Sequence, residues 1–98
     1  MHINPIKLYK YQKVHKTIKN SGLFDSKYYL FTYPDVRNQD VDPIKHYILY
    51  GVKEGRNPSA HFDTKYYLTT YNDIEVNKIN PLFHYLFSQV WKFHFQQP

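Results

Sequence analysis

The amino-acid sequence predicts an all-α fold: a short helical-repeat domain with two 38-residue helix-pair units, preceded by an N-terminal half-unit helix. An internal repeat is the first reason. Residues 24–48 are identical to residues 62–86 at 12 of 25 positions with no gap, where chance would give about one or two. The second reason is that helix-capping residues stand where each helix would begin, and the third is that strand patterns are weak. At 98 residues the chain has the length of one domain, for which we expect about five short helices.

The N-terminal half-unit, residues 4–20, is expected to form one amphipathic helix over roughly residues 5–19. Its start, Asn4-Pro5, stands 38 residues before Asp42-Pro43, so this segment matches the second half of a complete unit. One side of the helical wheel is mostly apolar and comprises Leu8, Tyr11, Val14, His15 and Ile18. The other side is basic and comprises Lys10, Lys13, Lys16 and Lys19.

Unit one, residues 24–58, is expected to begin with a helix over residues 26–33. Asp25 precedes it, and a carboxylate at that position accepts hydrogen bonds from the unpaired N–H groups of the first turn. Pro34 discourages the helix from continuing. The next segment, residues 35–41, is expected to form a single helical turn at most.

The second helix of unit one is expected to begin at Asp42-Pro43. Asp is a good capping residue, and Pro at the first helical position loses no hydrogen bond because its N–H would be unpaired anyway. The helix is predicted to extend to Tyr50. Gly51 then stands where many helices end on a glycine in the left-handed conformation.

Unit two, residues 62–87, repeats this plan with Asp63 and Asn80-Pro81 as helix starts. It departs from unit one where Asn72 replaces Pro34 and where Gln89 stands in the place of Gly51. Residues 88–98 are therefore expected to form a divergent C-terminal cap.

The residues shared by both units are most simply packing devices. They are Phe24, Asp25, Leu30, Asp35, His46 and Tyr47 in unit one, and Phe62, Asp63, Leu68, Asp73, His84 and Tyr85 in unit two. Because a single unit cannot cover its own apolar face, neighbouring units should bury each other. We expect Leu30 and Leu68 to lie in the resulting core.

Composition and charge exclude several functional classes. The chain has no cysteine, which excludes disulfides and Cys-based metal sites or nucleophiles. The net charge of +5 arises entirely in the first twenty residues, which hold five Lys and no acidic residue. No apolar run approaches the roughly 18 residues that span a bilayer, and the N-terminus lacks the apolar region of a secretory signal. We expect a cytoplasmic protein, with peripheral attachment to the inner face of the membrane as an alternative.

The motif string of unit one resembles a known family of tandem repeats. Its parts are Phe-Asp-x-x-Tyr-Tyr-Leu at 24–30, Tyr-Pro-Asp-Val at 33–36, Asp-Pro-Ile-x-His-Tyr at 42–47 and Tyr-Gly-x-x-Glu-Gly-Arg-x-Pro at 50–58. Such repeats accompany glycosyltransferases of bacterial capsule, rhamnan and related polysaccharide synthesis, and similar ones occur in some large surface proteins. The resemblance covers about two-thirds of the chain. It implies a non-catalytic accessory module that docks a glycosyltransferase, another polysaccharide-synthesis protein or a glycan.

Asp35 and His46 recur as Asp73 and His84, which makes each pair a candidate site. A His beside a carboxylate could serve acid–base chemistry or bind a metal. However, no nucleophile, second carboxylate or Gly-rich phosphate loop accompanies them. We favour a structural role, in which the His is hydrogen-bonded to the carboxylate or to a backbone carbonyl and ties a helix to the turn between the helices.

Three further residues are candidates for binding. Tyr29 and Tyr67 each belong to a Tyr–Tyr pair, and adjacent helical positions point about 100° apart, so one ring of each pair should pack inward while the other lies at the surface. These rings could stack on sugars, although packing in the core is the simpler role. Arg56 lies in Glu-Gly-Arg, which occurs once. It is expected to pair with an acidic side chain or a C-terminal carbonyl in a tight turn, with an acidic or phosphorylated ligand as the alternative.

The lysine face of the N-terminal helix, Lys10 to Lys19, is most simply a solvated surface. Its alternative partners are an anionic membrane surface, an acidic protein and nucleic acid, of which nucleic acid is disfavoured because the repeat body is neutral. The six His residues lack metal-ligand spacing. We expect no metal, no cofactor and no enzymatic activity. An exposed edge where a third repeat would pack could drive self-association.

Overall fold

The structure is a computed structural model that describes residues 4–95. These residues contain seven α-helices and one π-helical turn. Side chains are described as far as Gln89. Within residues 4–95 the extended pairing is limited to one isolated bridge between Ser59 and Phe62. The all-α prediction is therefore confirmed. The number of helices exceeds the five expected because both segments between the predicted helices form a short helix of their own.

Helix α1 (Pro5–Ser21) is the predicted N-terminal helix, extended by two residues. The Asn4 side chain caps it by accepting the N–H of Ile6 at 2.9 Å, and Gly22 ends it with φ +73°, a conformation that favours glycine. Ile18 is fully buried, whereas Leu8 is 41% exposed. The predicted apolar side thus reaches the core only in the C-terminal half of the helix.

Helices α2 (Ser26–Thr32) and α3 (Pro34–Gln39) meet at Tyr33. The Asp25 carboxylate accepts the N–H of Tyr28 at 2.9 Å, so the predicted cap is present. Pro34 ends α2 as predicted, but it also occupies the first position of α3, where its fixed φ suits a new helix.

Helix α4 (Pro43–His46) continues directly into the π-helical turn η1 (Tyr47–Gly51). The predicted left-handed conformation of Gly51 is wrong. Gly51 is buried at the end of η1, and a Cβ there would collide with the Tyr29 hydroxyl and lie 3.2 Å from the Tyr47 ring. Glycine is required by this close approach. The left-handed glycine is Gly55, with φ +71°, in the turn that follows.

Unit two forms α5 (Thr64–Thr70), α6 (Asn72–Val76) and α7 (Pro81–Phe95). The caps of α2 and α5 are nearly superimposable in conformation, with φ and ψ of −98° and 97° at Asp25 and of −99° and 103° at Asp63. Asn80 caps α7 by accepting the N–H of Phe83 at 3.0 Å. The C-terminal segment expected as a divergent cap continues α7 to Phe95, and residues 96–98 lie outside the described residues.

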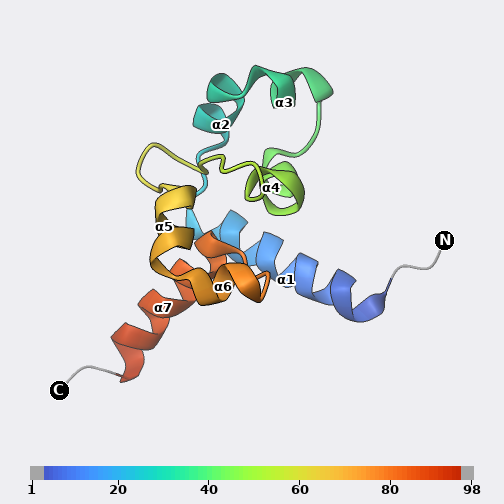
Figure 1. The fold of residues 1–98 in the computed structure, drawn as a ribbon. Coiled ribbons are helices and arrows are strands. Elements are labelled where there is room, and N and C mark those ends of the chain that lie inside the picture. Colours follow the sequence, from blue (N-terminus) through green and yellow to red (C-terminus); the bar gives the residue numbers. More distant parts are fainter. Residues whose placement is uncertain (1–3, 96–98) are drawn as a thin grey trace.

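Figure 1 shows α2, α3 and α4 gathered in one group and α5, α6 and α7 in a second, while α1 runs along both and contacts α4 and α7. The two groups are joined by a hydrogen bond of 3.0 Å between the buried hydroxyls of Tyr47 and Thr64. The fully buried hydrophobic residues come from α1 and from both groups: Ile18, Tyr29, Val36, Tyr47 and Leu82.

Leu30 and Leu68 were expected in the core, but both are only partly buried. In unit one the second tyrosine of the Tyr-Tyr-Leu segment takes the most buried position, since Tyr29 is wholly enclosed and Leu30 packs beside the core cluster. None of the helices in residues 4–95 has both the length and the apolar character needed to cross a membrane.

Candidate functional site

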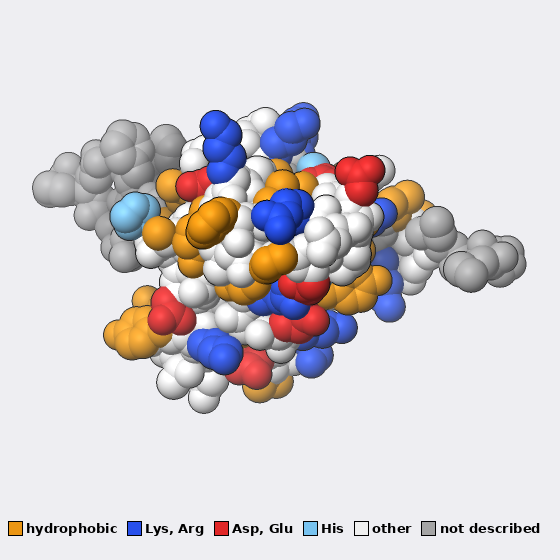
Figure 2. Space-filling model, turned by 90° about the horizontal axis from the view of Figure 1, so that it is seen from above, with side chains coloured by type: hydrophobic (Ala, Val, Ile, Leu, Met, Phe, Trp, Pro, Cys, Tyr) orange, Lys and Arg blue, Asp and Glu red, His pale blue; other side chains and the backbone are white. Residues whose placement is uncertain are grey.

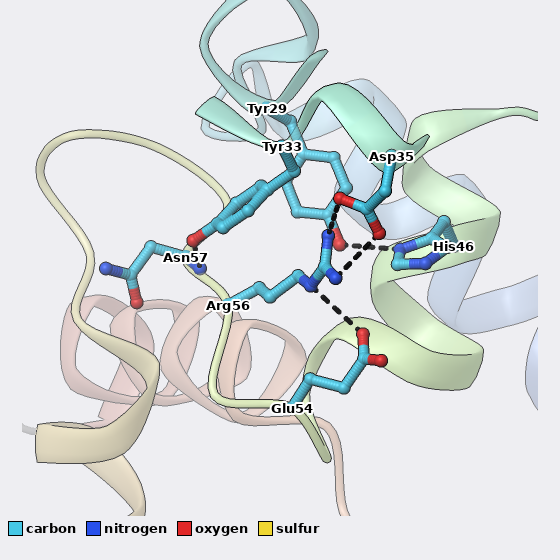
Figure 3. A network of polar contacts seen from close by, with 7 residues as sticks. All are labelled: Tyr29, Tyr33, Asp35, His46, Glu54, Arg56 and Asn57. Carbon is cyan, nitrogen blue, oxygen red and sulfur yellow. Dashed lines mark hydrogen bonds and ion pairs between the residues drawn. The ribbon is translucent and has the colours of Figure 1, made fainter. Parts of the chain in front are cut away.

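The most highly connected polar group in the described residues is Arg56, which lies just after the Gly55 turn. Its two terminal nitrogens donate to the two carboxylate oxygens of Asp35 at 2.9 and 2.8 Å, and its Nε forms an ion pair with Glu54 at 3.0 Å. The guanidinium carbon also lies 4.7 Å from the centre of the Tyr33 ring (Figure 3). A planar guanidinium can satisfy a carboxylate and an aromatic face together, whereas an ammonium group cannot match this geometry.

The chain after η1 folds back onto α2 and α3 and so brings Arg56 to Asp35. The Arg56 N–H donates to the Gly51 carbonyl at 2.9 Å, and the Asn57 N–H donates to the Tyr33 hydroxyl at 2.8 Å (Figure 3). The Pro58 carbonyl then accepts the N–H of Asp25 at 2.9 Å. We call residues 52–58 the return segment. The predicted ion pair of Arg56 in a tight turn is present, with Asp35 as its main partner.

His46 does not pair with Asp35, so that expected contact is wrong. Its Nδ1 lies 2.8 Å from the Tyr29 hydroxyl, and both side chains are buried (Figure 3). Burial lowers the pKa of His46, with the positive charge of Arg56 acting in the same direction, and burial raises the pKa of Tyr29. Both shifts favour the neutral forms, so the contact is a hydrogen bond between uncharged groups. Asp35 is instead hydrogen-bonded to Arg56, and these hydrogen bonds lower the pKa of the Asp35 carboxyl.

Unit two repeats the His–Tyr contact but lacks the return segment. Tyr67 lies 2.6 Å from His84 Nδ1, matching the bond between Tyr29 and His46. The aromatic clusters also match, since Phe24–Tyr29 and Phe62–Tyr67 have the same ring separation of 5.2 Å. However, α7 continues through the position equivalent to Gly51, and no described side chain forms an ion pair with Asp73.

The two candidate stacking residues, Tyr29 and Tyr67, differ in how deeply they are buried. Tyr29 is fully buried, so its ring cannot meet a sugar at the surface, and this candidate is withdrawn. Tyr67 is partly buried, and its neighbour Tyr66 is 70% exposed. Tyr28, the neighbour of Tyr29, is partly buried. The expected outer ring is present in unit two as Tyr66, whereas in unit one neither Tyr28 nor Tyr29 is exposed.

A wide groove of about 910 Å³ lies between α1, the η1 turn, α5 and the connection from α6 to α7. Four lysines and two glutamates are among the residues that line it: Lys10, Lys53, Lys65, Lys78, Glu54 and Glu75. Its apolar lining is mostly aliphatic and includes Val14, Ile48, Val52, Leu68 and Ile79. We call this the lysine-rimmed groove. Asn80 also lines it, and the Asn80 side-chain nitrogen is buried without a hydrogen-bond partner.

Sequence reasoning identified Lys10 but missed the other three lysines of the groove. Lys53 and Lys78 lie in two separate turns and Lys65 lies in α5, and only the fold brings these side chains together. No spacing along the chain could therefore have revealed that they share a groove. Figure 2 shows basic and acidic side chains interspersed with hydrophobic ones on the face seen from above.

The lysine face of α1 is exposed at every predicted position, namely Lys10, Lys13, Lys16 and Lys19. On the opposite side of the helix His15 bonds the Asp42 carboxylate at 2.7 Å and so fixes α1 to the start of α4. Burial alone would raise the pKa of Asp42, but the hydrogen bonds from His15 and from the Ile44 N–H hold it below its usual value.

The described residues contain no cluster of three or more His, Cys, Asp or Glu side chains that could hold a metal ion. The fold and these surfaces define the chain as an all-α, tyrosine-rich helical domain with two aromatic clusters. Comparison of the sequence and structure with protein families, with curated proteins and with solved structures gives no match.

Proposed function

We propose that this chain is a non-catalytic helical-repeat interaction module of bacterial capsule-type polysaccharide synthesis, which acts in the cytoplasm by docking a glycosyltransferase or another protein of that machinery. The resemblance of residues 24–58 and 62–86 to repeats that accompany such transferases provides the setting. The lysine-rimmed groove is the observation that carries the docking role.

The composition of the groove supports an acidic protein segment as its occupant. Four lysines against two glutamates give its walls a net positive charge, which attracts carboxylates and steers an acidic partner toward the site. Its largely aliphatic floor suits the apolar side chains of an amphipathic segment better than the polar faces of a sugar chain.

The state of the polar residues supports a non-catalytic role. Arg56, Asp35, His46 and Tyr29 are the groups best suited to chemistry in unit one, and each is already bonded to another of them. The matching caps and His–Tyr contacts of the two units support a repeat architecture in which the shared residues build the scaffold.

The experiment is a binding measurement between this chain and a glycosyltransferase encoded beside it. The test variant is Lys53→Glu with Lys78→Glu, on the groove. The matched control is Lys27→Glu with Lys45→Glu, which makes the same change of charge at exposed positions that do not line the groove. We expect the groove variant to weaken binding about tenfold or more and the control to change it less than about threefold. Equal losses would show that only net charge matters, and no binding by the unmodified chain would refute the docking partner.

A second candidate function is attachment to an anionic membrane surface through α1. It is favoured by the exposed apolar residues that accompany the lysines in the first turns of this helix, since Ile6 and Tyr9 are both 64% exposed. Apolar side chains beside lysines suit a headgroup region, and each lysine near the surface contributes about 1 kcal/mol.

Flotation with vesicles tests this candidate. Vesicles of phosphatidylglycerol should carry the chain and vesicles of phosphatidylcholine should not. The variant Lys10→Gln, Lys13→Gln, Lys16→Gln should lose most of the attachment. Absence of flotation even at low salt would remove the candidate. Nucleic acid remains the weakest partner, and equally tight binding to duplex DNA would reverse that ranking.

A further inference from the structure

We propose that unit two carries an open arginine-binding site, formed by Tyr71, Asp73 and His84, whose ligand is the arginine of a Glu-Gly-Arg-x-Pro segment in a partner protein. The inference rests on a comparison inside the molecule. In unit one the corresponding residues Tyr33 and Asp35 hold Arg56, so the occupied site shows which chemical group the open one fits. It depends neither on the lysine-rimmed groove nor on a role in polysaccharide synthesis.

The receptor side of the site is repeated 38 residues later with nearly the same framework. The ring centres of Tyr67 and Tyr71 are 4.7 Å apart, and those of Tyr29 and Tyr33 are 4.9 Å apart. Both His–Tyr pairs have ring centres 5.8 Å apart. Asp35 and Asp73 each stand in the first turn of the short helix that follows, α3 and α6 respectively.

The orientation of one ring differs between the two sites. Tyr71 is inclined at 39° to Tyr67, whereas Tyr33 is inclined at 62° to Tyr29. The Tyr71 ring also lies 5.6 Å from the His84 ring. In unit one the Tyr33 ring is covered by the guanidinium, and its hydroxyl accepts the Asn57 N–H.

The site in unit two is accessible. Tyr71 is 43% exposed, Asp73 is exposed, and His84 is more exposed than the buried His46. The position 38 residues after Arg56 is residue 94, which lies within α7 instead of in a return segment. Because α7 continues as a helix where unit one turns back, unit two has no return segment like that of unit one.

The chemistry of the site favours arginine over the other cations. In unit one the carboxylate of Asp35 and the face of Tyr33 together hold a planar fork that donates two hydrogen bonds and stacks on a ring, and Asp73 and Tyr71 are the same residue types at the equivalent positions. A lysine offers a single point charge and would use only part of this geometry. Metal binding is disfavoured because no third ligand lies near Asp73 and His84 among the described residues.

A separate partner protein is favoured over a second copy of this chain. The Arg56 side chain is only 18% exposed, makes hydrogen bonds to Asp35 and forms an ion pair with Glu54. The residues after it are also held, by the bonds of Asn57 and Pro58. Release of Arg56 toward another copy would therefore dismantle the site in unit one.

The test uses the intact chain and a labelled ten-residue peptide with the sequence of residues 50–59, Tyr-Gly-Val-Lys-Glu-Gly-Arg-Asn-Pro-Ser. Fluorescence anisotropy should show weak binding, with a Kd of roughly 0.1–1 mM. Replacing the peptide arginine by lysine should weaken binding about fivefold or more, and replacing it by glutamine should abolish it.

Two variants of the chain locate the peptide. Asp73→Asn should weaken binding about tenfold, whereas Glu75→Gln, which removes the same charge from the same helix, should change it less than twofold. Both positions are exposed, so circular dichroism should show both variants folded. Equal binding by Asp73→Asn and the unmodified chain, equal binding of the lysine peptide, or no binding at millimolar peptide would each overturn the site. Dimerisation of the chain that Arg56→Gln abolishes would overturn the choice of a separate partner.

Discussion

Units one and two begin with nearly the same residues and end differently. Each places a capped helix, a tyrosine–histidine bond and an aromatic cluster in the same arrangement. Unit one then turns back at Gly51 and covers this arrangement with the return segment, whereas α7 of unit two continues straight on. The consequence is visible in burial, since Tyr29 and His46 are buried while Tyr67 and His84 are only partly so.

This difference separates two roles within one motif string. The Gly-x-x-Glu-Gly-Arg part is not needed to form the helix pair, because unit two forms the pair without it. The Gly-x-x-Glu-Gly-Arg part adds the cover and the charge of Arg56. We therefore expect each substitution below to cost more in unit one than at the matching position of unit two.

The largest difference is expected at the tyrosine that follows each histidine. Tyr47 is fully buried, and its hydroxyl bonds Thr64 across the two groups of helices, whereas Tyr85 is only partly buried. Tyr47→Ala should reduce the free energy of unfolding by about 3–5 kcal/mol, as for other large aromatic truncations in a core. Tyr85→Ala should cost roughly half as much. Urea denaturation measures both, and equal costs would contradict the division into covered and open units.

The next effect concerns Gly51, the glycine that directly precedes the return segment. Gly51→Ala adds a methyl group that collides with the Tyr29 hydroxyl, so it should cost about 1–3 kcal/mol through overpacking. Gln89→Ala, at the matching and exposed position of α7, should stay within about 0.5 kcal/mol of the unmodified chain. A harmless Gly51→Ala would show that the Tyr29 ring can move aside.

A smaller contrast is expected when only a hydroxyl is removed. Tyr29→Phe leaves His46 buried without its partner and should cost about 1–3 kcal/mol. Tyr67→Phe leaves His84 within reach of water, so its cost should be below about 1 kcal/mol. Thermal unfolding of the pair of variants provides the comparison, and the reverse order would place the tighter hydrogen bond in unit two.

The smallest effect is a pH dependence that only unit one can show. Hydrogen bonds from Arg56 hold the pKa of Asp35 below its ordinary value of 3.8, so this contribution to stability is complete above that pH and is lost as the pH falls through the lower value of the folded state. The difference in melting temperature between the unmodified chain and Arg56→Gln should therefore be constant near neutral pH and shrink below about pH 4. Arg37→Gln, an exposed position on α3, serves as the control and should show no such change.

The local elements of the fold were predictable because the signals for them are local. Asp25, Asp63 and Asn80 cap their helices as the sequence indicated, and Pro34 ends α2. Each of these contacts joins residues within a few positions of one another. The repeat itself predicted that the same local contacts would occur twice.

The contacts that were missed all join distant parts of the chain. His46 was expected to bond a carboxylate or a backbone carbonyl, but its partner is the Tyr29 hydroxyl, and Asp35 is held by Arg56, which is 21 residues away. In the sequence, Gly51 stands where a glycine often ends a helix. Only the position of Tyr29 in the fold shows that glycine is needed there because a Cβ would collide with the Tyr29 hydroxyl. The lysine-rimmed groove combines side chains from α1, α5 and two turns, which no periodicity along the sequence relates.

The bond between the Asp25 N–H and the Pro58 carbonyl has a consequence for how such a chain can grow. It brings the first and last residues of unit one to the same place, so the path enters and leaves the unit at a single point. A segment with adjoining ends can be copied or deleted without changing the route of the chain on either side, as with insertions at neighbouring termini in other domains. The constant interval of 38 residues between the units is what such copying would leave in a gene. An engineered chain with a second copy of residues 24–61 inserted after residue 61 should therefore add one more closed unit and keep its neighbours folded.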